Sequence, residues 1–314
     1  MGVQIPPSAL SPTRHDVDTR LPAAYALRVK LLRALLLLLI ALAATGREPN
    51  PHVRMMKATF RIQQQQVPTG DTVAMNWGTA FLLALPRPPG DSARRFIMVT
   101  AEHVLERMDA ADHAQLCLRR RLAGGEYARE YVGFRVRTGG TPYWTALEDS
   151  STDVAALFVE LPASVEVESL RMTDLADDDD LEEYAVHAGG ELYSLGFPLF
   201  QGSNEFEFPV LRRGVIASYP VTPTDRFPNM SYDADLRPGD SGGPVYFTRH
   251  SNPGTTAAEP GTERNLHRIV GLVSRRSEHP EWLSASGDEP LKVAVVVTAP
   301  QVKRTVQKLL AENE

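Results

Sequence analysis

One serine stands out because of the residues around it. Ser241 lies in "LRPGDSGGPV", residues 236–245, between glycines at 239 and 243. A serine hydroxyl is a poor nucleophile unless a base, a group that orients this base and donors for an oxyanion lie nearby. Glycines leave room for a substrate and allow backbone angles that other residues avoid, so the N–H groups of Gly239 and Ser241 can point at one position. The motif therefore predicts a nucleophile inside its own oxyanion loop.

The pattern G-x-S-x-G has two other interpretations. It is compatible with a tight turn that carries an incidental serine, and with the strand-to-helix elbow of the α/β-hydrolases. In those hydrolases the catalytic histidine follows the serine along the chain. The histidines that follow Ser241 here, at 250, 267 and 279, have no context typical of a base. The elbow is therefore disfavoured.

The best candidates for base and orienting acid precede the serine. His103 follows the apolar run "FIMVTA", where a strand would end and a short helix begin. Asp153 opens "DVAALFVEL", a carboxylate followed at once by a buried strand, whereas its rival Asp149 lies in a polar turn. The resulting order is His–Asp–Ser, that of the chymotrypsin-like enzymes.

The elements that must position these residues are mostly short strands. Apolar segments bounded by Gly, Pro, Asp and Asn predict strands at 58–62, 78–85, 95–101, 131–137, 153–161, 191–197, 211–219, 243–248, 267–274 and 292–298. Only 102–119 and 299–313 are expected to be helical, the second with Val302, Val306, Leu309 and Leu310 on one face. Many strands with little helix predict an all-β barrel or sandwich.

Composition restricts the partners and the compartment. The net charge of −6 gives no basic field for nucleic acid, and Cys117 is the only cysteine, so neither an intrachain disulfide nor a cysteine-based metal site is possible. The acidic run 177–180 lacks the ligand spacing of a calcium loop and is expected to be a solvated linker. We expect no metal and no cofactor.

The N-terminus has the features of an export signal. Basic residues at 28, 30 and 33 precede the apolar run 34–44, which ends in small residues and is too short to span a bilayer. We predict a leader at 1–45, a linker at 46–57 and an exported domain, periplasmic or secreted, at 58–314. If the leader is not cleaved, it would anchor the protein in the membrane; no other membrane contact is expected.

Three segments together resemble the signatures of the trypsin/chymotrypsin-like serine peptidases: "VTAEHV", "TDVAAL" and "PGDSGGPV". "LYSLGFP" is similar to a strand end in bacterial members such as the high-temperature-requirement proteases, and "IVGLVS" resembles the strand that pairs with the substrate backbone. The resemblance implies two six-stranded antiparallel β-barrels, at about 58–170 and 184–298, with the site in the cleft between them and a C-terminal helix at 299–313.

The resemblance also implies roles for individual residues. Ser241 would form the acyl-enzyme, His103 would act as base and then acid, and Asp153 would fix the tautomer of His103. The N–H groups of Gly239 and Ser241 would hold the oxyanion. Ser274 would lie on the wall that receives the substrate chain.

Specificity is open at this stage. Asp235 matches the acidic pocket base of trypsin and would favour Lys or Arg, but "YDADLRPGDSGG" also resembles a bacterial pattern in which this position is not a specificity acid. Arg276 could narrow the pocket, neutralise Asp235 or attract acidic substrates instead. Asp240 precedes the nucleophile as in the animal enzymes, yet no freed N-terminus is evident to pair with it, so Arg237 or a backbone donor is its expected partner.

These observations predict a serine endopeptidase that acts on protein or peptide substrates through an acyl-enzyme. The alternative is a trypsin-fold binding module, a pseudo-protease that recruits a partner through the same cleft without catalysis.

Overall fold

The computed structural model describes residues 50–66, 74–85, 95–149, 152–165, 167–250, 265–276 and 293–313. All of them belong to one compact unit, Pro49–Glu314. The predicted leader at 1–45 lies outside the described residues, so export stays a prediction. Within the described ranges no helix has the length and apolarity needed to cross a membrane.

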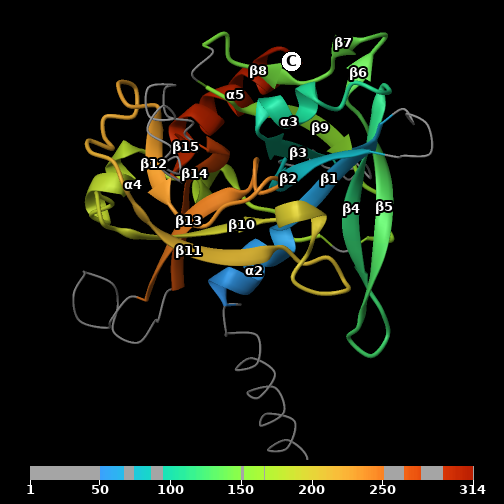
Figure 1. Cartoon of the computed structure of the whole chain (residues 1–314), viewed down its shortest axis with the longest axis horizontal. Helices are drawn as coiled ribbons and strands as arrows, with labels where there is room; N and C mark the ends of the chain where they lie inside the picture. The colour runs from blue at the N-terminus through green and yellow to red at the C-terminus, as the bar shows by residue number, and fades with distance from the viewer. Residues whose placement is uncertain are drawn as a thin grey trace, which may run out of the picture. The chain divides into compact units, whose positions relative to one another are not determined.

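The first half of the unit is a seven-stranded antiparallel sheet (Figure 1). Its strands run in the order β5-β4-β1-β2-β3-β9-β8. They are β1 (Thr59–Gln65), β2 (Met75–Ala84), β3 (Arg95–Thr100), β4 (His113–Arg121), β5 (Tyr127–Arg135), β8 (Thr145–Ala146) and β9 (Ala155–Glu160), with a small ribbon of β6 (Arg137–Thr138) and β7 (Thr141–Pro142) beside them.

The second half is a closed six-stranded barrel in the order β10-β11-β12-β15-β14-β13. Its strands are β10 (Glu191–Gly196), β11 (Val210–Ile216), β12 (Asn229–Asp233), β13 (Pro244–His250), β14 (Asn265–Arg276) and β15 (Ala294–Thr298). The all-β class and this six-stranded barrel are as predicted. The first half differs in detail, because its sheet has seven strands with β5 and β8 at the two ends.

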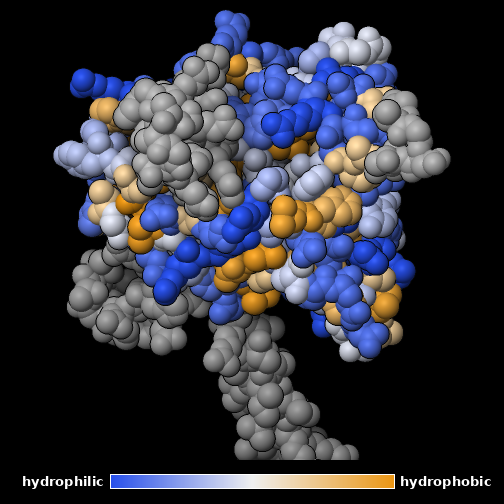
Figure 2. All heavy atoms as spheres, in the orientation of Figure 1, coloured by the Kyte–Doolittle hydropathy of each residue, from blue (hydrophilic) through white to orange (hydrophobic). Residues whose placement is uncertain are grey.

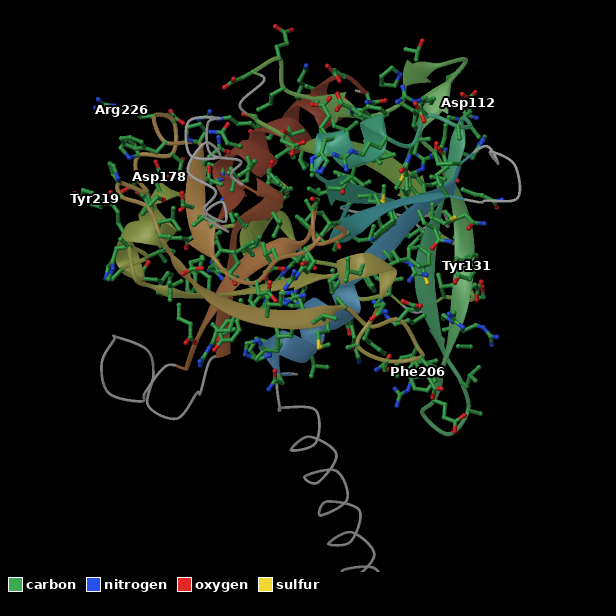
Figure 3. The ribbon with its side chains drawn as sticks, viewed as in Figure 1. Asp112, Tyr131, Asp178, Phe206, Tyr219 and Arg226 are labelled. Carbon is green, nitrogen blue, oxygen red and sulfur yellow. The ribbon has the colours of Figure 1, made fainter. Side chains whose placement is uncertain are left out.

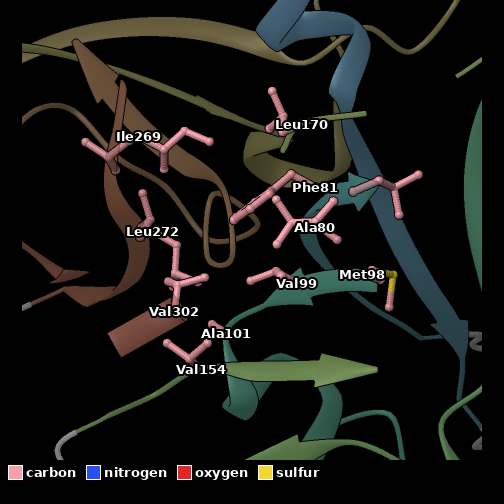
Figure 4. Packing of buried hydrophobic residues seen from close by; sticks show 14 of the residues in the cluster. Ala80, Phe81, Met98, Val99, Ala101, Val154, Leu170, Ile269, Leu272 and Val302 are labelled. Carbon is pink, nitrogen blue, oxygen red and sulfur yellow. The ribbon is translucent and has the colours of Figure 1, made fainter. Parts of the chain in front are cut away.

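Burial explains which strands are central. β2 lies between β1 and β3, and a run of six consecutive residues in it is buried, which matches its nearly continuous apolar sequence. β5 is an end strand with exposed and partly buried residues in alternation, as expected when one face meets solvent. Apolar side chains from both halves join in one core cluster, part of which is drawn in Figure 4.

Helices occupy the ends and the connections. They are α2 (Pro51–Ala58), α3 (Glu102–Glu106), α4 (Asp178–Glu183) and α5 (Ala299–Ala311), with 3-10 turns η1 (Met172–Asp174) and η2 (Pro198–Phe200). α2 lies in the predicted linker and is capped by Asn50, whose side chain accepts a hydrogen bond from the His52 N–H. The prediction that the acidic run 177–180 is a linker is wrong, because Asp177 caps α4 and 178–180 form its first turn. Two of its carboxylates pair with Arg268 and Lys303.

The prediction of a helix over 102–119 is wrong beyond its first turn. α3 ends at Glu106, and the chain enters β4 at His113. In β4 the exposed His113 and Gln115 alternate with the buried Ala114 and Leu116, which is strand rather than helix periodicity. The pairing of β4 with both β1 and β5 stabilises the extended form.

The outer surface carries scattered apolar groups. On the face in Figure 2 polar residues predominate, and the apolar ones form small separate groups. The most exposed large apolar side chain among the described residues is Tyr219, at 83% exposure, which lies at the left edge of the view in Figure 3. Within the same residues, no group of three or more His, Cys, Asp or Glu side chains could hold a metal ion.

The packing of the C-terminal helix α5 on the core can be tested by substitution. Leu309 is 4% exposed in the core, whereas the adjacent Leu310 is only partly buried against it. Leu309→Ala should lower the free energy of unfolding by about 2–4 kcal/mol, because it removes buried methyl groups and leaves a cavity. Urea denaturation measures this loss. Leu310→Ala is the matched control, and an equal or larger loss in it would contradict the described packing.

Candidate active site

Antiparallel pairing brings His103 and Asp153 together. Thr100 at the end of β3 pairs with Ala155 at the start of β9. His103 follows β3 by three residues and lies in α3, and Asp153 precedes β9 by two. The imidazole Nδ1 lies 2.7 Å from Oδ2 of Asp153, and the backbone N–H of His103 donates to Oδ1 at 3.0 Å. Two contacts therefore hold this carboxylate against His103 and leave the Nε2 side of the ring for chemistry.

Ser274 completes the environment of the acid. Its hydroxyl donates a hydrogen bond of 2.5 Å to Oδ2 of Asp153 from β14 of the barrel. Burial acts to raise the pKa of Asp153, but the hydrogen bonds and charge of His103, together with the Ser274 hydroxyl, outweigh it and lower this pKa to about 2. The structure places Ser274 against the acid, a contact that its predicted place on the substrate wall did not include.

The loop of Ser241 requires its glycines. Gly239 and Gly242 have φ angles of +102° and +86°, a region that disfavours side chains. A Cβ on Gly239 would also collide with the Phe197 carbonyl and the Trp77 indole. A Cβ on Gly243 would collide with the Leu195 carbonyl. The glycines therefore serve both the turn and the close approach of neighbouring backbone.

The loop is attached to both halves of the molecule. On the first sheet, Thr79 of β2 donates its N–H to the Ser241 carbonyl at 2.9 Å and its hydroxyl to the Gly239 carbonyl at 2.7 Å. On the barrel, the Gly242 N–H donates to the Val273 carbonyl at 2.7 Å. Ser241 thus lies at the junction of the two halves.

Ser241 and His103 line the same cavity of about 100 Å³, with Gly239 beside them. Among the described residues, the backbone N–H groups of Gly239 and Ser241 have no hydrogen-bond acceptor, and the Ser241 hydroxyl makes no hydrogen bond to the imidazole. Two N–H donors without partners next to a serine hydroxyl are the arrangement that an oxyanion requires.

Asp240 has the backbone partner that the sequence suggested and one that it did not. Its Oδ2 accepts the Arg237 N–H at 2.7 Å, and Arg212 Nε of β11 lies 3.5 Å from the same oxygen. Asp240 is 2% exposed, so a nearby guanidinium compensates a buried charge. Nothing in the local sequence pointed to Arg212, since barrel closure brings it to the loop.

The predicted specificity residue Asp235 lies apart from the cavity. The Asp235 carboxylate is 62% exposed and pairs with Arg237 at 2.9 Å and Arg212 at 3.9 Å. Asp235 is not among the residues that line the cavity at Ser241. The backbone of Arg276 ends β14, while its side chain lies outside the described part of the chain. Preference for Lys or Arg stays a prediction.

Two buried arginines that sequence reasoning missed hold the connection between β10 and β11, residues 197–209. Arg61 of β1 forms an ion pair of 2.7 Å with Glu207 and lies 4.0 Å over the Phe200 ring. Arg119 of β4 donates to the Glu207 carbonyl, and burial lowers the pKa of this guanidinium to about 10. Phe206 reaches the β4–β5 hairpin in Figure 3.

This connection, 197–209, also contacts the serine loop. The Leu199 N–H donates to the Pro238 carbonyl at 2.8 Å, and the Phe200 ring lies 5.5 Å from the Trp77 ring of β2. Phe197 donates its N–H to the Thr79 hydroxyl at 3.2 Å. The buried arginines of the first sheet therefore help to place a barrel loop that packs on the Ser241 segment.

A sequence model of the trypsin-like peptidase domain matches residues 78–250, more than half of the chain. The chain belongs to the trypsin-like peptidases. The matched range contains His103, Asp153 and Ser241. No curated protein matches the sequence.

Solved structures of the same kind are similar to this trypsin-like peptidase. One is an HtrA-type protease, AlgW with a tripeptide, at 14% identity and a TM-score of 0.46, covering 84% of this chain and 64% of that one. Another is Deg5, at 16% identity and a TM-score of 0.44, covering 83% of this chain and 92% of that one. A third is the MamO protease domain from Magnetospirillum magneticum, at 14% identity and a TM-score of 0.42, covering 80% of this chain and 96% of that one. This chain thus spans less than two thirds of the AlgW chain.

The low pKa of Asp153 predicts a pH dependence of stability. The folded carboxyl titrates near pH 2 and an unperturbed one near 3.8, so the unfolded state binds more protons between these values. The stabilisation, about 2 kcal/mol, is complete above about pH 4 and is lost as the pH falls towards 2.

Urea denaturation of the wild type and of Asp153→Asn at several pH values measures the stabilisation by the Asp153 carboxylate. The difference in unfolding free energy between the two should shrink over that acidic window. A difference that stays constant from pH 6 to pH 2 would contradict the assignment.

The pair of Arg61 and Glu207 predicts a coupled effect. Arg61→Met should cost about 2–3 kcal/mol, because it leaves the mostly buried Glu207 with only the more exposed Arg129 as an ion-pair partner. The double variant Arg61→Met/Glu207→Gln should recover part of this loss. A double-mutant cycle in urea measures the coupling. Simple additivity of the two single variants would show that the ion pair does not hold the 197–209 connection.

Proposed function

We propose that this trypsin-like peptidase is an active serine endopeptidase that cleaves protein or peptide substrates through an acyl-enzyme on Ser241. The observation that carries the proposal is the shared cavity: His103, whose imidazole Asp153 orients, and Ser241 line the same space of about 100 Å³. A base, its orienting acid and the nucleophile are the minimum set for acyl transfer.

The proposed first step uses each contact. The Nδ1–H group of His103 donates a hydrogen bond to the Asp153 carboxylate, so Nε2 is the basic nitrogen and takes the proton of Ser241 as Oγ attacks the scissile carbonyl carbon. The carbonyl oxygen, on which negative charge develops, accepts hydrogen bonds from the N–H groups of Gly239 and Ser241. The imidazolium is stabilised by the Asp153 carboxylate, which its low pKa keeps ionised at neutral pH.

In the rest of the reaction His103 acts first as an acid and then again as a base. The imidazolium gives its proton to the leaving amine as the C–N bond breaks, and the acyl group remains on Oγ. A water then attacks the acyl carbon while Nε2 takes its proton, and the ester bond to Oγ breaks with return of a proton to Ser241. The chain's own residues supply every proton transfer in this sequence.

Fluorophosphonate labelling tests the nucleophile. The probe should label Ser241 in the folded protein, and Ser241→Ala should abolish labelling and lower peptide turnover by on the order of a million-fold. Thr248→Ala, a hydroxyl on the same barrel outside the cavity, is the matched control and should keep both signals. Absence of labelling in folded wild-type protein would refute the proposal.

The same experiment separates the pseudo-protease alternative. Labelling of Ser241 without turnover of any peptide in a random library would favour a binding module, because the nucleophile would be reactive while the cleft does not process peptide bonds. Labelling together with turnover that depends on Ser241 supports the endopeptidase.

A further inference from the structure

The cavity at Ser241 has a distinct composition. It is lined by Asn76 and Trp77 of β2, His103 and Val104 of α3, Arg107, and Pro238, Gly239 and Ser241 of the serine loop. Among the described residues that line it there is no Asp or Glu and no residue of β14. The cavity therefore opens on the side of Ser241 formed by the first sheet, away from the strand whose sequence resembles the one that pairs with substrate.

His103 determines which part of a substrate would enter this side. In the proposed mechanism the imidazole protonates the leaving amine, so the residues that depart with the amine begin beside His103. Both His103 and Val104 line the cavity. The residues that follow the scissile bond are thus the ones that meet the cavity.

Two side chains of the cavity offer unused donors. The Trp77 indole N–H is buried and has no hydrogen-bond partner within the described ranges. A buried donor without an acceptor is destabilising, so an acceptor brought by a ligand would bind favourably. Trp77 also packs edge-on against Phe200, a contact that holds the indole in place.

Arg107 supplies the charge. It is exposed, and its guanidinium forms no ion pair with any described residue. Its backbone carbonyl, in contrast, is engaged by the side-chain amides of Asn76 and Gln66, which attach this segment to β1–β2. An unpaired cation and an unused N–H donor that belong to the same cavity lining are complementary to a carboxylate.

We propose that this cavity is a subsite for an acidic side chain, Asp or Glu, on the leaving-group side of the scissile bond. Arg107 attracts the carboxylate and the Trp77 N–H donates to it. This assignment rests on the proposed peptidase function for its direction along the substrate. It makes Arg107 and Trp77 specificity-determining residues, separate from the triad.

Matched peptides test the subsite in two ways. The best-cleaved peptide from a random library is made with Asp, Asn or Lys directly after the scissile bond, and kcat/KM is compared among the three. The same peptides, labelled with a fluorophore, are titrated into Ser241→Ala, and fluorescence anisotropy gives Kd without turnover. If the library contains no cleaved peptide, fluorescent peptides drawn from it at random with the same three residues are titrated instead.

We expect Asp to be preferred over Lys by about five- to tenfold in both readouts, as for a partly exposed ion pair with a hydrogen bond. Arg107→Glu should invert this ratio. Trp77→Phe keeps the ring against Phe200, removes only the N–H and should weaken the Asp peptide more than the Lys peptide. Arg121→Glu, which changes an exposed arginine at the far end of β4, is the charge-matched control and should leave the ratio unchanged.

The outcomes are distinguishable. The subsite would be overturned if the Asp and Lys peptides had equal kcat/KM and equal Kd, or if no peptide bound. It would also be overturned if Arg107→Glu and Arg121→Glu changed the Asp-to-Lys preference equally. Loss of hydrolysis in wild type together with Arg107-dependent preference for Asp in the anisotropy titration would support the subsite and refute the peptidase function. An Asp peptide unaffected by Trp77→Phe would overturn the role of the indole.

Discussion

Thr79 is the residue on which the arrangement of the site depends. It is fully buried, and its N–H and hydroxyl both bind the Ser241 loop, which belongs to the barrel. Its carbonyl accepts the Thr100 hydroxyl from β3, the strand that leads to His103. A single position of the first sheet therefore connects the nucleophile segment to the base segment. Because each of these bonds lies in the interior, where an unpaired group is costly, the two halves have little freedom to shift at the site.

Buried charge is compensated in the same region by local partners and by partners from distant parts of the chain. Asp153 is held by His103 and Ser274, and Asp240 by the Arg237 backbone with Arg212 nearby. Each partner comes from a different strand or loop, so removal of one would leave an ionised group in a poorly solvated place. The site thus combines electrostatic preorganisation with hydrogen bonds that hold the serine loop in a conformation that only glycines at 239 and 242 readily adopt.

Sequence patterns predicted most of the fold because burial follows periodicity. The strands around His103, Asp153 and Ser241 and the helix at the C-terminus lie where apolar alternation and turn residues indicated. The helix predicted over 102–119 is wrong after Glu106, since pairing of β4 with β1 and β5 outweighs a weak helical pattern. Arg61, Arg119 and Arg212 were missed, because a sequence shows an arginine without showing what it faces.

The sequence by itself determined the family, the all-β class and the candidate nucleophile, base and acid, since these depend on residue types in local context. Only the tertiary structure decided that Ser274 contacts Asp153, that Arg212 lies near Asp240, and that Asp235 pairs with arginines outside the cavity at Ser241. These contacts join residues that are far apart along the chain. Their geometry is produced by strand pairing and barrel closure, which local patterns do not encode.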